Sequence, residues 1–232
     1  MALLLYDERP LPNNCTHILD SSIDSRRSIL QKGAALATGA ILPGVAGAYT
    51  LPDLPYPYES LEPHIDAATM KLHHDKHHAT YVAGINKYME GKDEPDIVDL
   101  MTDALEAGPT RNSGGGHYNH AFFWSEMAPA AEAKKTKVSD QLQGMIDKSF
   151  GSMDAMKEQF AALAAPAATF GSGWVWVCVT DKDELKLVNT PNQDNPLMKG
   201  SAAGEIMYPI LGLDVWGKFQ KLYLVFLLSY CS

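Results

Sequence analysis

The sequence predicts an α+β fold in which an N-terminal helical hairpin precedes a mixed lobe with helices and a small antiparallel sheet. Two observations predict it: apolar residues at helical spacing from Leu61 to about Met89, and a change to short, strongly apolar segments after residue 173. The 232 residues are 46% hydrophobic and 20% charged, which is ordinary for a chain that buries a sizeable core.

Residues 1–48 are interpreted as a targeting segment rather than as part of the fold. Arg26 and Arg27 precede a stretch of small residues from Gly33 to Ala48 that ends in Ala-Gly-Ala, and this arrangement resembles a twin-arginine export signal. The alternative is an alanine-rich and glycine-rich helix behind a chance arginine pair. The stretch is too short and too weakly apolar for a membrane span, so we expect a mature form without membrane association that begins near Tyr49.

Residues 49–134 are predicted to form the helical-hairpin domain. One helix covers Leu61 to about Met89, with Pro63 in its first turn, and a second covers Asp96 to Ala107. A glycine-rich stretch, residues 112–116, then leads into an aromatic run, residues 117–124. The polar segment 130–137 is the expected boundary between the two domains.

Residues 135–232 are predicted to form the second domain. Two helices are expected between Ser139 and Ala165, with a break near residues 150–152. Residues 174–179 and 185–188 read as paired strands joined by a turn at 181–183, and a third strand runs from Ile210 to Asp214.

Polar residues with metal-binding chemistry gather on the first predicted helix. His73, His77 and Tyr81 follow each other at i, i+4 and i+8, so they are expected to share one helical face. His74 and His78 are rotated onto a neighbouring face, which we expect to be more hydrated. This helix alone is weak evidence for a metal, because neutral imidazoles are common in polar cores.

Two further residues make a metal centre the better interpretation. His120 lies in an apolar aromatic run, where a buried imidazole needs a partner, and Asp214 ends an apolar strand. Imidazoles from two helices can meet across a helix pair. Together with a carboxylate they form a mixed nitrogen and oxygen shell, which suits manganese or iron rather than a closed structural zinc site.

Five segments resemble the iron/manganese superoxide dismutase family, in its order and spacing: LPDLPYPYESLEPHIDAATMKLHHDKHHATYV, GGGHYNHAFFW, FGSGWVWV, NQDNPL and PILGLDVW. The resemblance covers about Tyr49 to Trp216. It implies an enzyme that converts superoxide to oxygen and hydrogen peroxide at a single redox metal. It further implies the following roles: metal ligands His73, His120 and Asp214; substrate-funnel residues His77 and Tyr81; pocket walls Trp124, Trp174 and Trp216.

The resemblance also implies manganese as the cofactor, with iron as the other possibility. In the manganese type, a glutamine of the Asn-Gln-Asp loop hydrogen-bonds the solvent on the metal, and a glycine lies four residues before the second ligand. Gln193 and Gly116 match both positions. Moving one outer hydrogen-bond donor retunes a metal, and Gln193, Tyr81 and His77 are expected to manage the protons of the reaction.

Charge and cysteine content restrict the partners. The chain carries a net charge of −9, and its sequence contains no extended stripe of basic residues. Both features argue against nucleic-acid binding. The expected partner is the superoxide anion, attracted by local charge at the metal. Cys15, Cys178 and Cys231 are too far apart in sequence to suggest a disulfide framework. The family resemblance implies a homodimer or homotetramer.

The resemblance ends after Trp216, so the C-terminus is truncated relative to the family. The family continues with Glu-His-Ala-Tyr-Tyr, whose histidine is the fourth ligand, whereas Lys218 occupies that position here. An ammonium group cannot coordinate a metal. One alternative is therefore an inactive or weakly metal-binding relative, and another, a zinc hydrolase using His73, His77 and His120, lacks the HExxH motif.

A gene-model hypothesis accounts for the unusual tail. The sequence GGTAAGTT, a splice-donor site, encodes Gly-Lys-Phe, the residues at 217–219, so the tail would be translated intron. A transcript that encodes Lys218 and the residues after it would refute this. An intron implies a eukaryotic source. The twin-arginine signal would then target the thylakoid lumen of a plastid, and the alternatives are the mitochondrial matrix and a bacterial periplasm.

Overall fold

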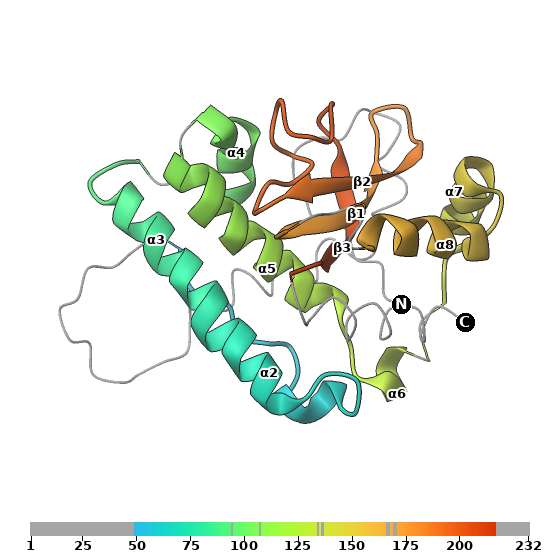
Figure 1. The fold of residues 1–232 in the computed structure, drawn as a ribbon, viewed down its shortest axis with the longest axis horizontal. Coiled ribbons are helices and arrows are strands. Elements are labelled where there is room, and N and C mark those ends of the chain that lie inside the picture. The colour runs from blue at the N-terminus through green and yellow to red at the C-terminus, as the bar shows by residue number, and fades with distance from the viewer. Residues whose placement is uncertain are drawn as a thin grey trace.

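The structure is a computed structural model that describes residues 49–93, 95–106, 108–133, 135, 137–165, 168 and 171–216. It confirms the α+β prediction: helices dominate the N-terminal half, and a small sheet with its own helices follows (Figure 1). The predicted export signal (1–48) and the aberrant tail (217–232) lie outside the described residues. The proposed domain boundary stays a prediction.

The first helix is continuous but changes its winding at the histidines. After a short 3-10 turn, η2 (Tyr58–Leu61), it runs through α2 (Ala67–Leu72), the π-helical η3 (His73–His78) and α3 (Ala79–Met89). It begins later than predicted because Asp66 acts as its N-cap, accepting a 2.8 Å hydrogen bond from the Thr69 amide. π-Helical turns are rare and are frequently found at functional sites.

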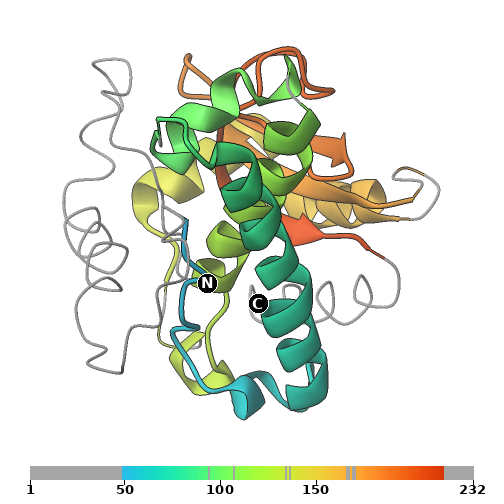
Figure 2. The ribbon, with the colours of Figure 1, turned by 90° about the vertical axis from the view of Figure 1, so that its left-hand side faces the viewer.

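The helix that pairs with the histidine helix includes the glycine-rich stretch as well as the aromatic run. The predicted helix at 96–107 is split into α4 (Ile97–Thr102) and η4 (Ala104–Glu106). The π-helical η5 (Thr110–Gly114) then leads into α5 (Gly115–Glu126), so the glycine-rich stretch is helical. α3 and α5 lie side by side, as both views show (Figures 1 and 2).

The second half builds a sheet against its own helices. A short α6 (Ala130–Ala133) is followed by α7 (Asp140–Phe150) and α8 (Met153–Ala164), which break at Gly151 as predicted. The antiparallel strands are β1 (Gly173–Val179), β2 (Leu185–Pro191) and β3 (Tyr208–Asp214), in the order β2-β1-β3. Trp174 of β1 lies opposite Asp214 of β3.

The main core joins α5 to the sheet and to α7 and α8. Its largest fully buried side chains include Trp124, Trp174 and Trp176. Burying an aromatic side chain removes about 150–250 Å² from water, so these rings hold the helical part and the sheet together. Within the described residues, no helix combines the length and apolar character that a membrane crossing requires.

Glu126 is a buried acid at the end of α5. Its Oε1 accepts a hydrogen bond of 2.7 Å from the Gly212 amide of β3, while its Oε2 has no hydrogen-bond partner among the described residues. Burial raises the pKa of the Glu126 carboxyl well above its ordinary value of 4.5, and the Gly212 hydrogen bond opposes this only in part.

This raised pKa predicts a pH-dependent stability. Above pH 4.5 the native state holds a proton that the unfolded state has released, so the free energy of unfolding falls as pH rises towards the native pKa of Glu126. Glu126→Gln removes this loss. Its stability relative to the wild type should increase by up to about 1.4 kcal/mol per pH unit in that window. Urea denaturation from about pH 5 to pH 8 measures it, and parallel curves for the two proteins would contradict the prediction.

Candidate metal centre

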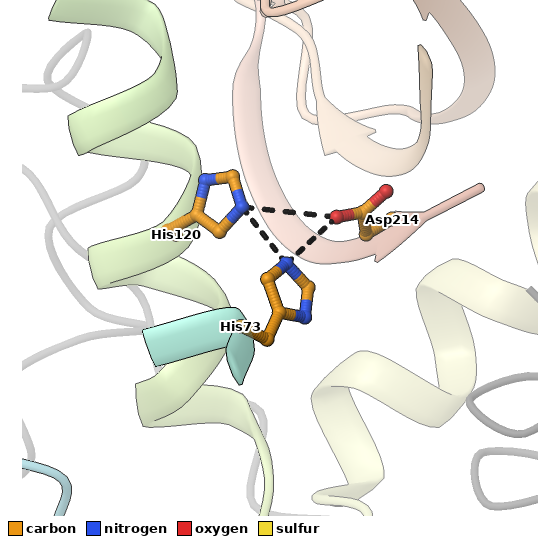
Figure 3. Close-up of side chains that lie close together, drawn as sticks. All are labelled: His73, His120 and Asp214. Atoms are coloured by element: carbon orange, nitrogen blue, oxygen red, sulfur yellow. Dashed lines mark hydrogen bonds and ion pairs between the residues drawn. The ribbon is translucent and has the colours of Figure 1, made fainter. Parts of the chain in front are cut away.

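Three predicted ligands from three separate elements converge in the interior (Figure 3). His73 begins η3, His120 lies within α5, and Asp214 ends β3; each side chain is buried. The two Nε2 atoms are 2.9 Å apart, and Asp214 Oδ2 lies 3.1 Å from His73 Nε2 and 3.7 Å from His120 Nε2. These three donor atoms lie within 4.8 Å of one another, so they could hold one metal ion between them.

The tautomer of His120 is fixed by its own helix. Its Nδ1–H donates to the Gly116 carbonyl over 2.7 Å, which leaves the Nε2 lone pair pointing at the other two donors. Burial and the nearby His73 lower the pKa of His120 to about 3. The imidazole is therefore neutral at neutral pH, which is the form that coordinates a metal.

Asp214 supplies the negative charge of the cluster. Burial alone raises the pKa of its carboxyl, but the hydrogen bond and charge of His73, with a smaller effect of His120, lower it overall. Its second oxygen, Oδ1, accepts a 2.9 Å hydrogen bond from the Trp216 amide. The turn after β3 thus aims Oδ2 at the imidazoles.

The donor set fits a manganese or iron ion. Donor atoms about 2.1 Å from one ion, at angles of about 90–120°, stand about 3.0–3.6 Å apart, and the three measured separations lie close to this range. Two neutral imidazoles and one carboxylate form the mixed shell that such ions accept. Without an ion, two Nε2 atoms at 2.9 Å can share at most one proton.

Gln193 lies beside this cluster with its amide held in one orientation. Its Oε1 accepts hydrogen bonds from Trp174 Nε1 (3.1 Å) and Asn119 Nδ2 (3.3 Å). Its Nε2 therefore donates, over 3.0 Å, to the phenol oxygen of Tyr81. Burial and the charge of Asp214 raise the pKa of Tyr81, so the phenol keeps its proton at neutral pH.

The predicted faces of the histidine helix are only partly right. The rings of His73 and His77 lie 5.8 Å apart, and the Tyr81 ring lies 5.3 Å from that of His120, which places the predicted stripe along the site. The prediction of a hydrated face for His74 and His78 is wrong: both are buried, and His77 is the exposed one. The wider π turn of η3 changes the angle between successive residues.

Two of the three predicted tryptophan walls are in place. The Trp124 ring lies 5.0 Å from that of His73, and the Trp174 ring lies 5.3 Å from that of His120, with both tryptophans fully buried. Trp216 is 48% exposed instead. It lies two residues beyond the end of β3.

Comparison with known proteins identifies the family. The model of the iron/manganese superoxide dismutase alpha-hairpin domain matches residues 48–128, and that of the C-terminal domain matches residues 138–220. The chain belongs to the iron/manganese superoxide dismutase family. A superoxide dismutase [Fe] of Raoultella planticola is 49% identical over 176 residues, which cover 73% of this chain and 96% of that protein.

Membership of the superoxide dismutase family makes the chain an oxidoreductase with a metal-binding fold. The family takes iron or manganese, and the relative above is named for iron. Family membership therefore does not decide between iron and manganese.

The Tyr81 ring packs so closely against position 116 that only glycine fits there. A Cβ at position 116 would lie 2.4 Å from the Tyr81 ring, so Gly116→Ala must displace that ring from Gln193. We expect a loss of about 1–3 kcal/mol in the free energy of unfolding from this overpacking. Chemical denaturation measures it, with Gly144→Ala as the control, because nothing lies within 4 Å of a Cβ there. Equal stability of Gly116→Ala and the wild type would contradict the contact.

Several dismutase-site neighbours were missed by sequence reasoning. Trp124 Nε1 donates to His78 Nδ1 over 2.9 Å, and His78 Nε2 then donates to His117 Nδ1 over 2.8 Å. This series of hydrogen bonds connects the helix of His73 to the helix of His120. The signal was present in the sequence, since His117 precedes His120 by one helical turn.

An ion pair between the exposed Arg111 and the buried Asp194 holds the loop of Gln193. Arg111 donates to both carboxylate oxygens of Asp194, over 2.7 and 2.8 Å. Such bidentate pairs fix geometry as well as charge. The pair ties η5, at the start of the His120 helix, to the residue after Gln193, and no local pattern in the sequence indicates it.

Proposed function

We propose that this chain disproportionates superoxide at a manganese ion held by His73, His120 and Asp214. The observation that carries the proposal is the convergence of their three buried donor atoms beside the oriented amide of Gln193. In the balanced reaction, two superoxide anions and two protons give one oxygen and one hydrogen peroxide. The bound ion supplies the one-electron chemistry between its +3 and +2 states.

The chain's own residues provide charge, exclusion of water and protons. One carboxylate and two neutral imidazoles leave a bound cation incompletely neutralised, so the site attracts a small anion although the whole chain carries −9. Trp124 and Trp174 keep the site dry. Tyr81 retains a phenol proton next to Gln193 Nε2, and His77 lies exposed beside His73, so these groups can pass protons towards the product.

The preference for manganese over iron is supported by two residues. Gln193 approaches the site from the loop after β2, and Gly116 leaves room for the Tyr81 ring against α5. A glutamine at position 116, the iron-type arrangement, would collide with that ring. The relative named for iron is a reason to measure the metal directly.

A Gln193→Ala variant tests this assignment. Purified protein loaded with Mn(II) should consume superoxide, and loss of the amide should lower kcat/KM by about 10–100-fold and shift the midpoint potential, because outer hydrogen-bond partners tune bound metals. Gln143→Ala is the matched control, since its amide bonds Asp147 on the exposed side of α7. Unchanged activity and potential in Gln193→Ala would remove Gln193 from the mechanism.

A second candidate function follows from Lys218. If the C-terminal residues are as the sequence gives them, the family's fourth ligand is absent, and the chain is a weak metal binder with little activity. Metal analysis and a superoxide assay on the full chain separate the two. Stoichiometric manganese with turnover supports the dismutase, and a folded protein that retains no metal supports the inactive relative.

A further inference from the structure

One side chain connects two of the three elements that carry the predicted metal ligands. Glu126 ends α5, the helix of His120, and its Oε1 accepts the Gly212 amide proton over 2.7 Å. Gly212 precedes Asp214 by two residues on β3. A single buried hydrogen bond therefore links the helix of one ligand to the strand of another.

The geometry of β3 explains why this amide needs a partner. The Val215 amide donates to the Gly173 carbonyl at the start of β1. Because N–H groups along a strand point alternately to the two sides, the Gly212 amide faces away from β1, on the side where the described sheet ends. The side chain of Glu126 takes the place of a neighbouring strand there, in the interior.

The face of the sheet at Gly212 is also closely packed. A Cβ on Gly212 would lie 2.6 Å from the Trp176 ring. The backbone of β3 is thus in contact with Trp176 and is bonded to Glu126, so small shifts of this segment are opposed from two directions. Because Asp214 is only two residues further along β3, its position is restricted by the same two contacts.

Burial of Glu126 costs free energy that an apolar side chain at this position would not cost. Glu126 is buried, and its Oε2 has no hydrogen-bond partner among the described residues. A buried polar group without a partner costs about 1–3 kcal/mol, and replacing buried charged or polar groups by apolar ones of similar size is often neutral or stabilising. Placement of β3 is a role that an apolar side chain could not perform.

We propose that Glu126 is a positioning residue of the metal centre, holding Asp214 at a fixed place relative to His120 through the Gly212 amide. The proposal rests on the proposed function, since it assumes a metal at these ligands. Loss of the hydrogen bond removes none of the three ligands, but it lets the Asp214 carboxylate move with β3 relative to His120.

Glu126→Leu tests the proposal, because it keeps the volume and removes the acceptor. We expect Mn(II) affinity, measured by competition with a chromophoric chelator, to fall about tenfold, with an altered EPR spectrum of bound Mn(II). Glu126→Gln, which retains an acceptor oxygen, should bind Mn(II) within about twofold of the wild type. Glu126→Asp, whose carboxyl is drawn back by one methylene, should resemble the leucine variant and serves if that variant does not fold.

Thr180→Val is the matched control. Thr180 is buried, and its hydroxyl accepts backbone hydrogen bonds from Lys182 and Glu184, beyond the end of β1 that lies away from Asp214. It should lower stability and leave Mn(II) affinity and the EPR spectrum unchanged. Equal affinities of Glu126→Leu, Glu126→Asp and the wild type would overturn the proposal, as would an equal loss in Thr180→Val.

Hydrogen exchange of the metal-free protein separates this proposal from the proposed function. If the wild type retains no Mn(II), the proposed function fails, and the exchange rate of the Val215 amide then decides the positioning role. Faster exchange at Val215 in Glu126→Leu than in Thr180→Val supports anchoring of β3 by Glu126. Equal rates in the two variants would overturn it.

Discussion

Asp214→Asn will release the metal. Asparagine keeps the shape of the side chain and can still accept the Trp216 amide, but the carboxylate is the one anionic donor in the described cluster. A structural zinc site with four ligands binds its ion with about 10–16 kcal/mol, or about 3 kcal/mol per ligand, and we use this value as the scale for one ligand. Mn(II) affinity should therefore fall at least about 100-fold, and superoxide turnover should be lost with the metal.

Metal content after dialysis against a chelator measures this loss, together with a superoxide assay. Asp147→Asn is the control, because it removes the same charge from the exposed side of α7. An Asp214→Asn protein that keeps its manganese would show that the ion does not bind at these three donors.

Lys218→His will restore the family's fourth ligand and raise Mn(II) affinity. Position 218 follows Asp214 by four residues, as the family histidine does. Gaining an imidazole ligand is worth about 3 kcal/mol, so affinity should rise about 100-fold. The loss of one positive charge acts in the same direction, because like charges repel.

The comparison requires matched variants at the same position. Lys218→Gln removes the charge without supplying a ligand nitrogen, so the difference between the two variants isolates coordination. Chelator competition gives both affinities. Equal affinities would mean that residues 217–232 do not bring position 218 to the metal, and the inactive relative would then be the better interpretation.

Much of the fold followed from local patterns. Gly151 breaks α7 from α8 as predicted, and the apolar strands around Trp174 and Ile210 were found within one or two residues. Strand and helix periods are local properties, so they can be read without knowing the fold. The same patterns placed the start of the first helix at Leu61, because the N-cap role of Asp66 was overlooked.

Site residues were predictable only where a motif carried them. His73, His120 and Asp214 were named as ligands from an unusual row of histidines, an apolar setting and a family resemblance, and the structure brings their donor atoms together. Glu126 and Arg111 were not singled out. Their partners, Gly212 and Asp194, are far away in the sequence, so no local pattern links them.

The sequence by itself determined the donor chemistry: which imidazoles, carboxylate and amide are present, and that a lysine follows where a ligand is expected. Tertiary structure alone decided which histidines are buried, how Gln193 is oriented and what holds β3 in place. The reason is physical. Residue type fixes which atoms can bind a metal, whereas burial, tautomer and hydrogen-bond partner depend on the segments packed against each side chain.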